Sequence, residues 1–306
     1  MNARAHHRTN QQHPDRQGFA FGLAAYAFWG VLPIYFELLS NVPAPVIVAH
    51  RILWSLPILA LLIWVRKGWT NVRAAIAHPA TIGMLAVSAL LIAGNWLLYV
   101  YAVTQGHILA SSFGYYLNPI ANVLLGRFVL HERLNRLQWT AVAIATAGIS
   151  VLALGALSQL WISLTLCATF ALYGLLRKVV SADAVTGLGL ETALLFPPAI
   201  GWLAWRASMG LHVYGSSTSD TILLLCAGVA STTPLLLFTA AARKLAYSTL
   251  GMLQFIAPTL QFLIAVLLYG EPLKLAHLIA FPAIWVALGL YVTAMLREPR
   301  LPQPPE

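Results

Sequence analysis

Ten apolar stretches, each long enough to cross a lipid bilayer, follow one another along almost the whole chain. A membrane-spanning helix needs about 20 mostly apolar residues to cross roughly 30 Å of hydrocarbon. The stretches fall at 18–39, 44–65, 80–104, 108–130, 136–155, 158–178, 187–206, 219–240, 246–269 and 275–296. Only 9% of the residues are charged and 59% are hydrophobic, too little polar surface for a water-soluble fold. The sequence therefore predicts an all-α integral membrane protein with ten transmembrane helices.

The basic residues fall almost entirely on one side of these predicted spans. Fifteen of the 18 Lys and Arg residues lie in the two tails or in the loops that follow every second span. The opposite side holds only Arg206 and Lys274, and Arg51 lies within a span. Because positive loops stay in the cytoplasm, the pattern predicts that both termini are cytoplasmic. The net charge of +9 is spread over short loops, which indicates contact with anionic lipid headgroups rather than nucleic-acid binding.

The second half of the chain repeats the first. A shift of 139 residues places Tyr115 on Gln254, Pro119 on Pro258, Asn122 on Gln261 and Glu132 on Glu271. Five spans in each half would give the halves opposite orientations, the inverted-repeat plan of carriers that work by alternating access. The predicted divisions are a cytoplasmic tail at 1–17, repeats at 18–155 and 156–296, and a cytoplasmic tail at 297–306. Duplication retained for packing alone is the alternative.

Polar side chains recur at helical spacing inside otherwise apolar spans. In the stretch 108–130 they lie four, three and four residues apart, and the stretch 246–269 carries an equivalent face. Amides and phenols are costly against lipid unless they find partners or water. We therefore predict a hydrated central site, and the alternative is that these groups only join helices. The predicted substrate-binding residues are Trp29, Asn95, Tyr99, Tyr115, Asn118 and Gln254.

Ionisable residues within spans form a second set of candidates. Arg51, next to His50, lies about two turns into its span, and Glu37 lies near the outer end of the preceding one. A contact between Glu37 and Arg51 across the short first loop is therefore expected. Glu191 lies about one turn into its span, close to Arg177 across a cytoplasmic loop. A charge at such depth needs a partner or water, so these residues are structural ion pairs or take part in substrate binding or proton coupling.

Several sequence runs resemble a known family. The runs include His50 to Ser55, Gly94 to Leu98, Gly114 to Pro119, Tyr173 to Lys178, Ser248 to Gly251 and Tyr269 to Glu271. Together with the doubled plan, they resemble the EamA domains of the drug/metabolite transporter superfamily, and most closely its RarD branch, labelled chloramphenicol-sensitive proteins. The resemblance covers roughly residues 18–296. It implies a permease of the bacterial inner membrane that moves small metabolites or drugs outward and has no catalytic residues.

The function that we predict is therefore secondary transport of small organic metabolites or drugs by alternating access between the two repeats. A channel-like facilitator is one alternative, and an intramembrane enzyme is a more distant one. The sequence has no phosphate-binding loop of the Walker type, which argues against ATP hydrolysis. We expect no cofactor and no metal. The expected partners are a small-molecule substrate and membrane lipids, and the sequence leaves the oligomeric state open, a homodimer included.

Overall fold

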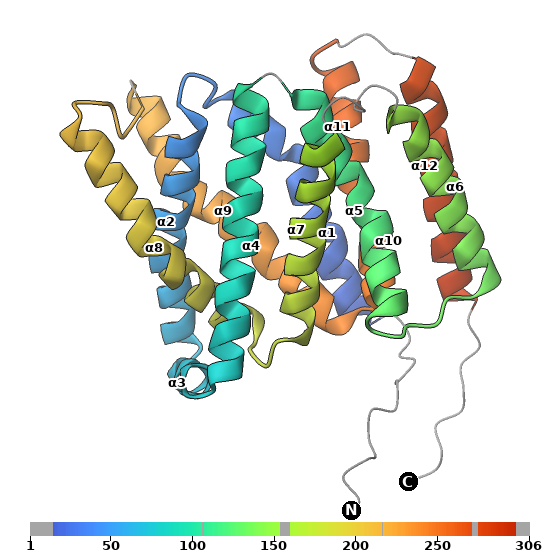
Figure 1. Ribbon diagram of the computed structural model, residues 1–306, viewed down its shortest axis with the longest axis horizontal. Coiled ribbons are helices and arrows are strands. Elements are labelled where there is room, and N and C mark those ends of the chain that lie inside the picture. Colours follow the sequence, from blue (N-terminus) through green and yellow to red (C-terminus); the bar gives the residue numbers. More distant parts are fainter. Residues whose placement is uncertain (1–14, 106, 154–159, 216, 271–274, 298–306) are drawn as a thin grey trace, which may run out of the picture.

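A computed structural model describes residues 15–297 apart from 106, 154–159, 216 and 271–274. The described residues form twelve α-helices and no strand (Figure 1). The helices are α1 (Arg16–Glu37), α2 (Ala44–Val65), α3 (Trp69–Ala77), α4 (Pro79–Thr104), α5 (Ile108–Phe128), α6 (Arg136–Ala153), α7 (Leu160–Val179), α8 (Ala184–Ser208), α9 (Thr218–Lys244), α10 (Tyr247–Leu253), α11 (Ile256–Leu267) and α12 (Leu275–Leu296).

The helix lengths suit a membrane protein. In the described part of the chain, eight helical segments are long and apolar enough to span a bilayer, and the pair α10 and α11 counts as one of them. The helix α6 is a shorter apolar segment, and α3 is a nine-residue helix in a stretch for which no span was predicted. The all-α membrane class is confirmed, while the number of ten spans stays a prediction.

Short polar caps start several of the helices at the ends of the bundle. Asp183 accepts hydrogen bonds from the backbone N–H groups of Val185 and Thr186 and so begins α8. Ser217 and Asp220 form a reciprocal capping box at the start of α9. Such caps satisfy N–H groups that have no partner within the helix. Burial acts to raise the pKa of Asp183, but hydrogen bonds from Thr186 and Val185 outweigh it and hold that pKa below its usual value.

The main contacts between helices stay the same when each helix is replaced by its predicted equivalent in the other half. The repeat equates α1 with α7, α2 with α8, α4 with α9, α5 with the pair α10–α11, and α6 with α12. Helix α1 packs against α9 and α11, and its equivalent α7 packs against α4 and α5. The pairs α2–α8, α5–α10 and α6–α12 each join equivalent helices, and the last pair forms one edge of the bundle (Figure 1). The division into two repeats stays a prediction. The proposed junction at 155 and 156 lies outside the described residues.

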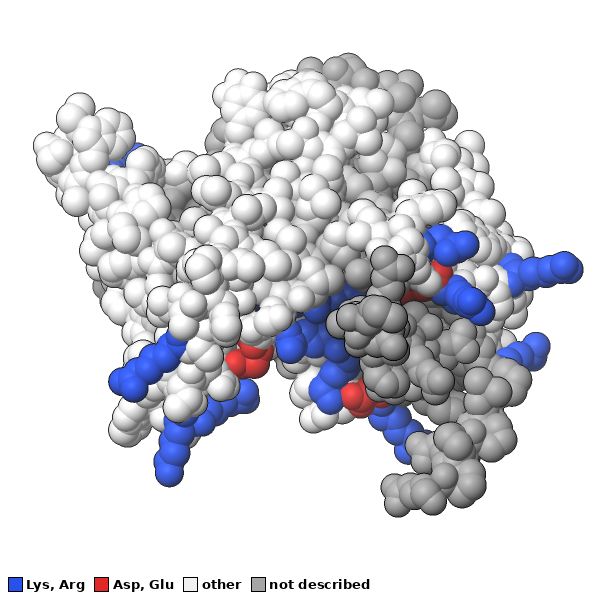
Figure 2. Space-filling view, turned by 60° about the horizontal axis from the view of Figure 1, so that its bottom comes forward, with Lys and Arg blue, Asp and Glu red and all other residues white. Residues whose placement is uncertain are grey.

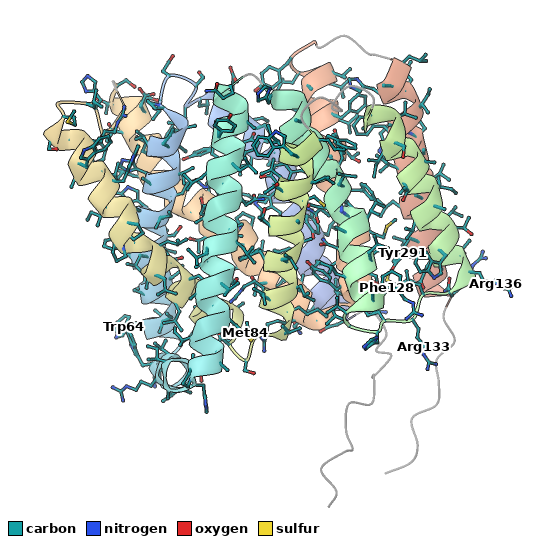
Figure 3. The ribbon with its side chains drawn as sticks, viewed as in Figure 1. Trp64, Met84, Phe128, Arg133, Arg136 and Tyr291 are labelled. Carbon is teal, nitrogen blue, oxygen red and sulfur yellow. The ribbon has the colours of Figure 1, made fainter. Side chains whose placement is uncertain are left out.

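The two ends of the bundle differ in charge. Lys and Arg side chains gather at the end shown at the bottom of Figure 1, and Figure 2 turns this end toward the viewer. Arg133 and Arg136 lie there, and the exposed side chains of Trp64 and Phe128 lie in the same region (Figure 3). Aromatic residues bordered by basic ones are typical of a membrane interface. We call this end the basic end.

Glycine brings helices of opposite halves into close contact at two places. A Cβ atom added to Gly30 of α1 would lie 2.7 Å from the Cβ atom of Leu260 in α11. A Cβ atom at Gly228 of α9 would collide with the backbone of Trp54 in α2. Only glycine fits such approaches, which are common where membrane helices cross. The helices that surround the middle of the bundle are therefore held at short distance.

Candidate functional site

A cavity of about 270 Å³ lies between the two halves, in the part of the bundle away from the basic end. Residues from the carboxyl-terminal parts of α1 and α4, the first turns of α5, and the start of α11 line it. Its aromatic lining residues are Tyr26, Trp29, Phe36, Trp96, Tyr99, Tyr115, Tyr116 and Phe170. Its polar and charged lining residues beyond the tyrosines are Arg51, Asn95, Ser112, Gln254 and Gln261. A mostly apolar hollow with a few polar groups is the usual form of a small-molecule site.

One wall of the cavity is fixed by the amide of Asn95. Its Nδ2 donates to the carbonyl oxygen of Leu166 and to Oγ1 of Thr169, at 2.9 Å each. Its Oδ1 accepts a hydrogen bond of 3.0 Å from the hydroxyl of Tyr115. The Tyr115 ring also packs against Tyr99, with ring centroids 5.7 Å apart. Asn95 therefore joins α4, α5 and α7, and holds the Tyr115 ring against the cavity.

The facing wall is formed where α10 ends and α11 begins. Pro258 has no N–H, so the carbonyl of Gln254 four residues earlier loses its usual helical donor. That carbonyl instead accepts from the N–H of Ala257 at 3.2 Å, and the helix is interrupted at Gln254 and Phe255. The Gln254 side chain lines the cavity, and its Oε1 accepts a 2.9 Å hydrogen bond from Nδ2 of Asn122. This bond links α5 to its counterpart in the other half.

Asn118 corrects the sequence-based picture, because it does not line the cavity. Its side chain is fully buried, and neither of its polar atoms has a hydrogen-bond partner in the described part of the chain. Three residues after Tyr115 it lies about 4.5 Å farther along the axis of α5, beyond the turns that border the cavity. The other five predicted residues, Trp29, Asn95, Tyr99, Tyr115 and Gln254, do line it. Their role in binding stays a prediction.

Arg51 lies in α2, and its guanidinium lies at the edge of this cavity. Its Nε donates a 2.7 Å hydrogen bond to Oγ of Ser231 in α9. Its Cζ lies 4.5 Å from the ring centroid of Trp96 in α4 and 5.7 Å from that of Phe36 in α1. Stacking on an aromatic face stabilises a cation. Three helices thus fix the orientation of Arg51.

The expected ion pair between Glu37 and Arg51 does not form. The ion pairs of the described residues join Arg177 to Glu191 and Lys244 to Asp15. Arg51 turns inward to Ser231 and Trp96, whereas Glu37 is exposed at the last residue of α1.

His50 is held on both ring nitrogens and does not line the cavity. Indole N–H is only a donor, so Nδ1 of His50 accepts from Nε1 of Trp54 at 3.1 Å. Its Nε2 then carries the proton and donates to the carbonyl oxygen of Val213 at 2.7 Å. This arrangement describes a neutral histidine that fastens the loop before α9 to α2.

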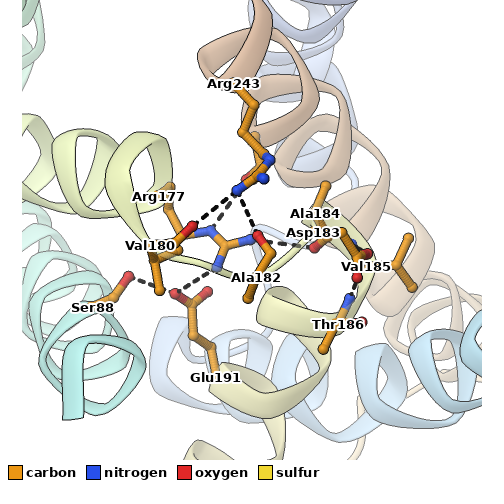
Figure 4. Close-up of polar contacts among 11 residues, drawn as sticks. Ser88, Arg177, Val180, Ala182, Asp183, Ala184, Val185, Thr186, Glu191 and Arg243 are labelled. Carbon is orange, nitrogen blue, oxygen red and sulfur yellow. Dashed lines mark hydrogen bonds and ion pairs between the residues drawn. The ribbon is translucent and has the colours of Figure 1, made fainter. Parts of the chain in front are cut away.

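The structure pairs Glu191 with Arg177 inside the bundle (Figure 4). The two charged atoms lie 3.4 Å apart, and both side chains are almost completely buried. Oε1 of Glu191 also accepts a 2.5 Å hydrogen bond from Ser88, and Arg177 donates to the carbonyl oxygen of Ala184 at 3.3 Å. The pair joins α7, α8 and α4 on the basic side of the cavity. Hydrogen bonds to both charges make it suited to holding helices together.

Toward the basic end the cavity is closed by aromatic packing. Tyr26, Tyr173, Phe238 and Tyr247 are fully buried there, and the rings of Tyr173 and Phe238 stack with centroids 6.2 Å apart. Beyond them, Glu132 joins the halves. Its carboxylate accepts hydrogen bonds from the N–H groups of Tyr247 and Ser248, at 2.5 and 2.9 Å, and from the Ser248 hydroxyl at 2.7 Å. The loop after α5 is thereby fixed to the first turn of α10. Its predicted counterpart Glu271 lies outside the described residues.

Three contributors to the site, Trp96, Phe170 and Ser231, were not predicted from the sequence. Trp96 is next to Asn95 in the sequence, and this was the only sequence feature that pointed to a place at the cavity. Phe170 packs its ring against Trp29 and Tyr115 from α7, a helix without a polar stripe in the predicted set. Ser231 lies in a Ser-Thr-Thr run of α9, and its bond to Arg51 depends on the crossing of α2 and α9.

Comparison with known proteins shows the family to which the chain belongs. Residues 16–154 match the EamA-like transporter family. An uncharacterised transporter of Pseudomonas aeruginosa is 45% identical over 295 residues, which cover 94% of this chain and 98% of that protein. Protein RarD of Escherichia coli is 44% identical over 285 residues, covering 90% and 94%. A solved crystal structure of a protein with 16% identity superimposes with a TM-score of 0.73 over 92% of this chain and 99% of the other, so the fold is shared.

A further relative in Pseudomonas aeruginosa, named chloramphenicol-sensitive protein RarD, is 32% identical over 90% of this chain and 93% of its own length. Identities of this size over nearly complete chains confirm the resemblance drawn from the sequence runs. The chain belongs to the EamA-like transporter family, and within it to the RarD branch.

Proposed function

We propose that this membrane transporter is a secondary carrier that moves small organic metabolites or drugs by alternating access, and that it works as an exporter and not as an enzyme. The observation that supports this most directly is the central cavity. Both halves line it, through Asn95 and Tyr115 on one side and Gln254 on the other. A solute held there contacts two repeats whose exchange of conformation would open the opposite end.

The closed end of the cavity supports a proposal for which side of the membrane the cavity faces. If the basic end faces the cytoplasm, as the positive-inside rule favours, the cavity lies toward the outer side. The protein is then an inner-membrane permease with both termini in the cytoplasm. Its cytoplasmic gate consists of the aromatic layer around Tyr173 and Phe238 and of the Glu132 carboxylate on α10. Opening to the cytoplasm requires Glu132 to release the N–H groups of Tyr247 and Ser248.

Two measurements test the carrier proposal. Metabolite profiling of spent medium should show the same compounds raised in an overexpressing strain and lowered in a deletion strain. Liposomes that contain the purified protein should then take up such a compound with saturation and counterflow. Single-channel current without counterflow would establish a channel instead, and unchanged medium in both strains together with no liposome uptake would refute transport of small metabolites.

A further inference from the structure

Arg51 carries a positive charge that the described protein does not neutralise. Only its Nε makes a hydrogen bond to the described residues, and that bond goes to the neutral hydroxyl of Ser231. The Arg51 Cζ lies over the Trp96 ring, 4.5 Å from its centroid, and the two terminal nitrogens make no hydrogen bond to the described residues, so their N–H groups remain available. Arginine does not lose its proton under ordinary conditions. A cation within a membrane protein needs an opposite charge or water.

The acidic residues of the bundle are committed elsewhere. Five of the six carboxylates in the described ranges are engaged: Asp15 with Lys244, Glu132 with α10, Asp183 with α8, Glu191 with Arg177 and Asp220 with α9. The sixth, Glu37, is exposed and makes no ion pair with Arg51. The described residues therefore supply no carboxylate to Arg51, and its charge is left to water or to an anion from outside them. The open side of its guanidinium borders the cavity.

The remaining lining of the cavity also selects by charge and shape. No Asp or Glu is among its described lining residues, so an ammonium group would find only aromatic faces and amides there. Trp29 lies 5.9 Å from Phe170 between ring centroids, and Tyr115 lies 6.3 Å from Phe170, so flat rings form one continuous wall. Such walls favour a flat apolar body through stacking and burial.

We propose that the cavity binds organic monoanions, in which a carboxylate accepts the free N–H groups of Arg51 and an aromatic or similarly flat body lies between the rings. A carboxylate suits this arginine because two parallel N–H groups meet its two oxygens. The inference rests on the proposed function and names the substrate class of the same cavity. Trp96 and Ser231 act as positioning residues, because they hold the guanidinium in one orientation.

Binding to the purified full-length protein in nanodiscs at low chloride tests this class. The anionic probes are benzoate, phenylacetate and indole-3-acetate. Benzamide has the shape of benzoate without its charge, and benzylamine carries the opposite charge. Thermal unfolding and tryptophan fluorescence report binding. We expect at least one of the three carboxylates to bind with a Kd about tenfold or more lower than those of benzamide and benzylamine, since a charge-assisted hydrogen bond contributes on this scale.

A variant of Arg51, a variant of its partner Ser231 and a surface control show where the anion binds. Arg51→Gln should weaken carboxylate binding about tenfold to hundredfold and leave benzamide binding unchanged. Ser231→Ala keeps the charge but releases the Nε atom, so it should weaken binding several-fold even where Arg51→Gln folds poorly. Arg136→Gln, an exposed site outside the cavity, should match the wild type.

The anion class is overturned if none of the three carboxylates binds, if benzamide or benzylamine binds as well as the carboxylate that binds most tightly, or if Arg51→Gln keeps the full response. These results leave carrier function separately measurable, because spent-medium profiles and liposome counterflow do not depend on the probes. Export of neutral or cationic compounds with no carboxylate binding would reject the anion class and retain the carrier.

Discussion

The buried pair of Arg177 and Glu191 offers a sharp test of what holds the bundle together. Arg177→Met removes the guanidinium, keeps much of the apolar stem, and leaves the Glu191 carboxylate with Ser88 as its remaining hydrogen-bond donor. Breaking a buried ion pair by removing one partner costs about 3–5 kcal/mol. Arg177 is fully buried and Glu191 nearly so, which places the expected loss in this range.

The assay is thermal unfolding of purified variants, followed by the loss of the monodisperse peak in size-exclusion chromatography. The unfolding entropy of about 2.1 cal/mol/K per residue corresponds, for a chain of 306 residues, to a midpoint shift of about 1.6 °C per kcal/mol, so Arg177→Met should unfold roughly 5–8 °C below the wild type. The double variant Arg177→Met/Glu191→Leu should regain most of this loss, because it leaves no unpaired charge. Arg136→Met, at an exposed position, serves as the matched control.

Two results would refute this reasoning. Arg177→Met could unfold within 2 °C of the wild type, which would mean that the pair is hydrated or readily replaced. Alternatively, the double variant could be no more stable than Arg177→Met, which would mean that packing and not charge accounts for the loss. Gly187→Ala gives an independent check, since its Cβ atom would collide with the Arg177 guanidinium. It should lower the unfolding temperature even though both charges remain.

Three further predictions concern the gate, the packing and the orientation in the membrane. Glu132→Ala removes the acceptor of three hydrogen bonds and should lower the free energy of unfolding by about 1–3 kcal/mol. It should also raise the reactivity of a cysteine placed at Ser248 toward a thiol reagent added at the basic end, and unchanged reactivity would exclude a gate. Gly30→Ala should lower the free energy of unfolding by about 1–3 kcal/mol, because its Cβ atom clashes with Leu260. The control Gly94→Ala has no atom within 4 Å of the added Cβ and should lower it by less than about 0.5 kcal/mol, and equal losses would contradict the close packing. In a background without native cysteines, Ala74→Cys on α3 should label only in inside-out vesicles and His212→Cys only from outside intact cells, and labelling of both from one side would overturn the proposed topology.

Sequence periodicity predicted the architecture well because the membrane restricts the choices. A backbone in lipid must satisfy its own hydrogen bonds, so long apolar stretches become helices with few alternatives. The same periodicity placed Tyr115 and Asn95 on inward faces, and the structure brings both to one cavity. The short helix α3 was missed because its moderately polar sequence lacks the length of a span.

The details of the site were less predictable, because they depend on how helices cross. Tyr115 and Asn118 share a helical face, yet only Tyr115 reaches the cavity, since its depth along α5 decides exposure. Glu37 and Arg51 are close in sequence, but Arg51 bonds to Ser231, which lies 180 residues away. A partner at that separation is visible only once the contact between α2 and α9 is known.

The two predicted repeats differ in conformation, and the difference lies at the cavity. Pro119 and Pro258 remove the same type of backbone hydrogen bond, from the carbonyls of Tyr115 and Gln254. Nevertheless, α5 continues through Pro119, whereas the helix of the other half is interrupted at Gln254. Because the missing donor is common to both, the surroundings must decide which helix breaks. If the two repeats exchange conformations during transport, the interruption should move to Tyr115, and α10 and α11 should become one continuous helix in the state that opens to the basic end.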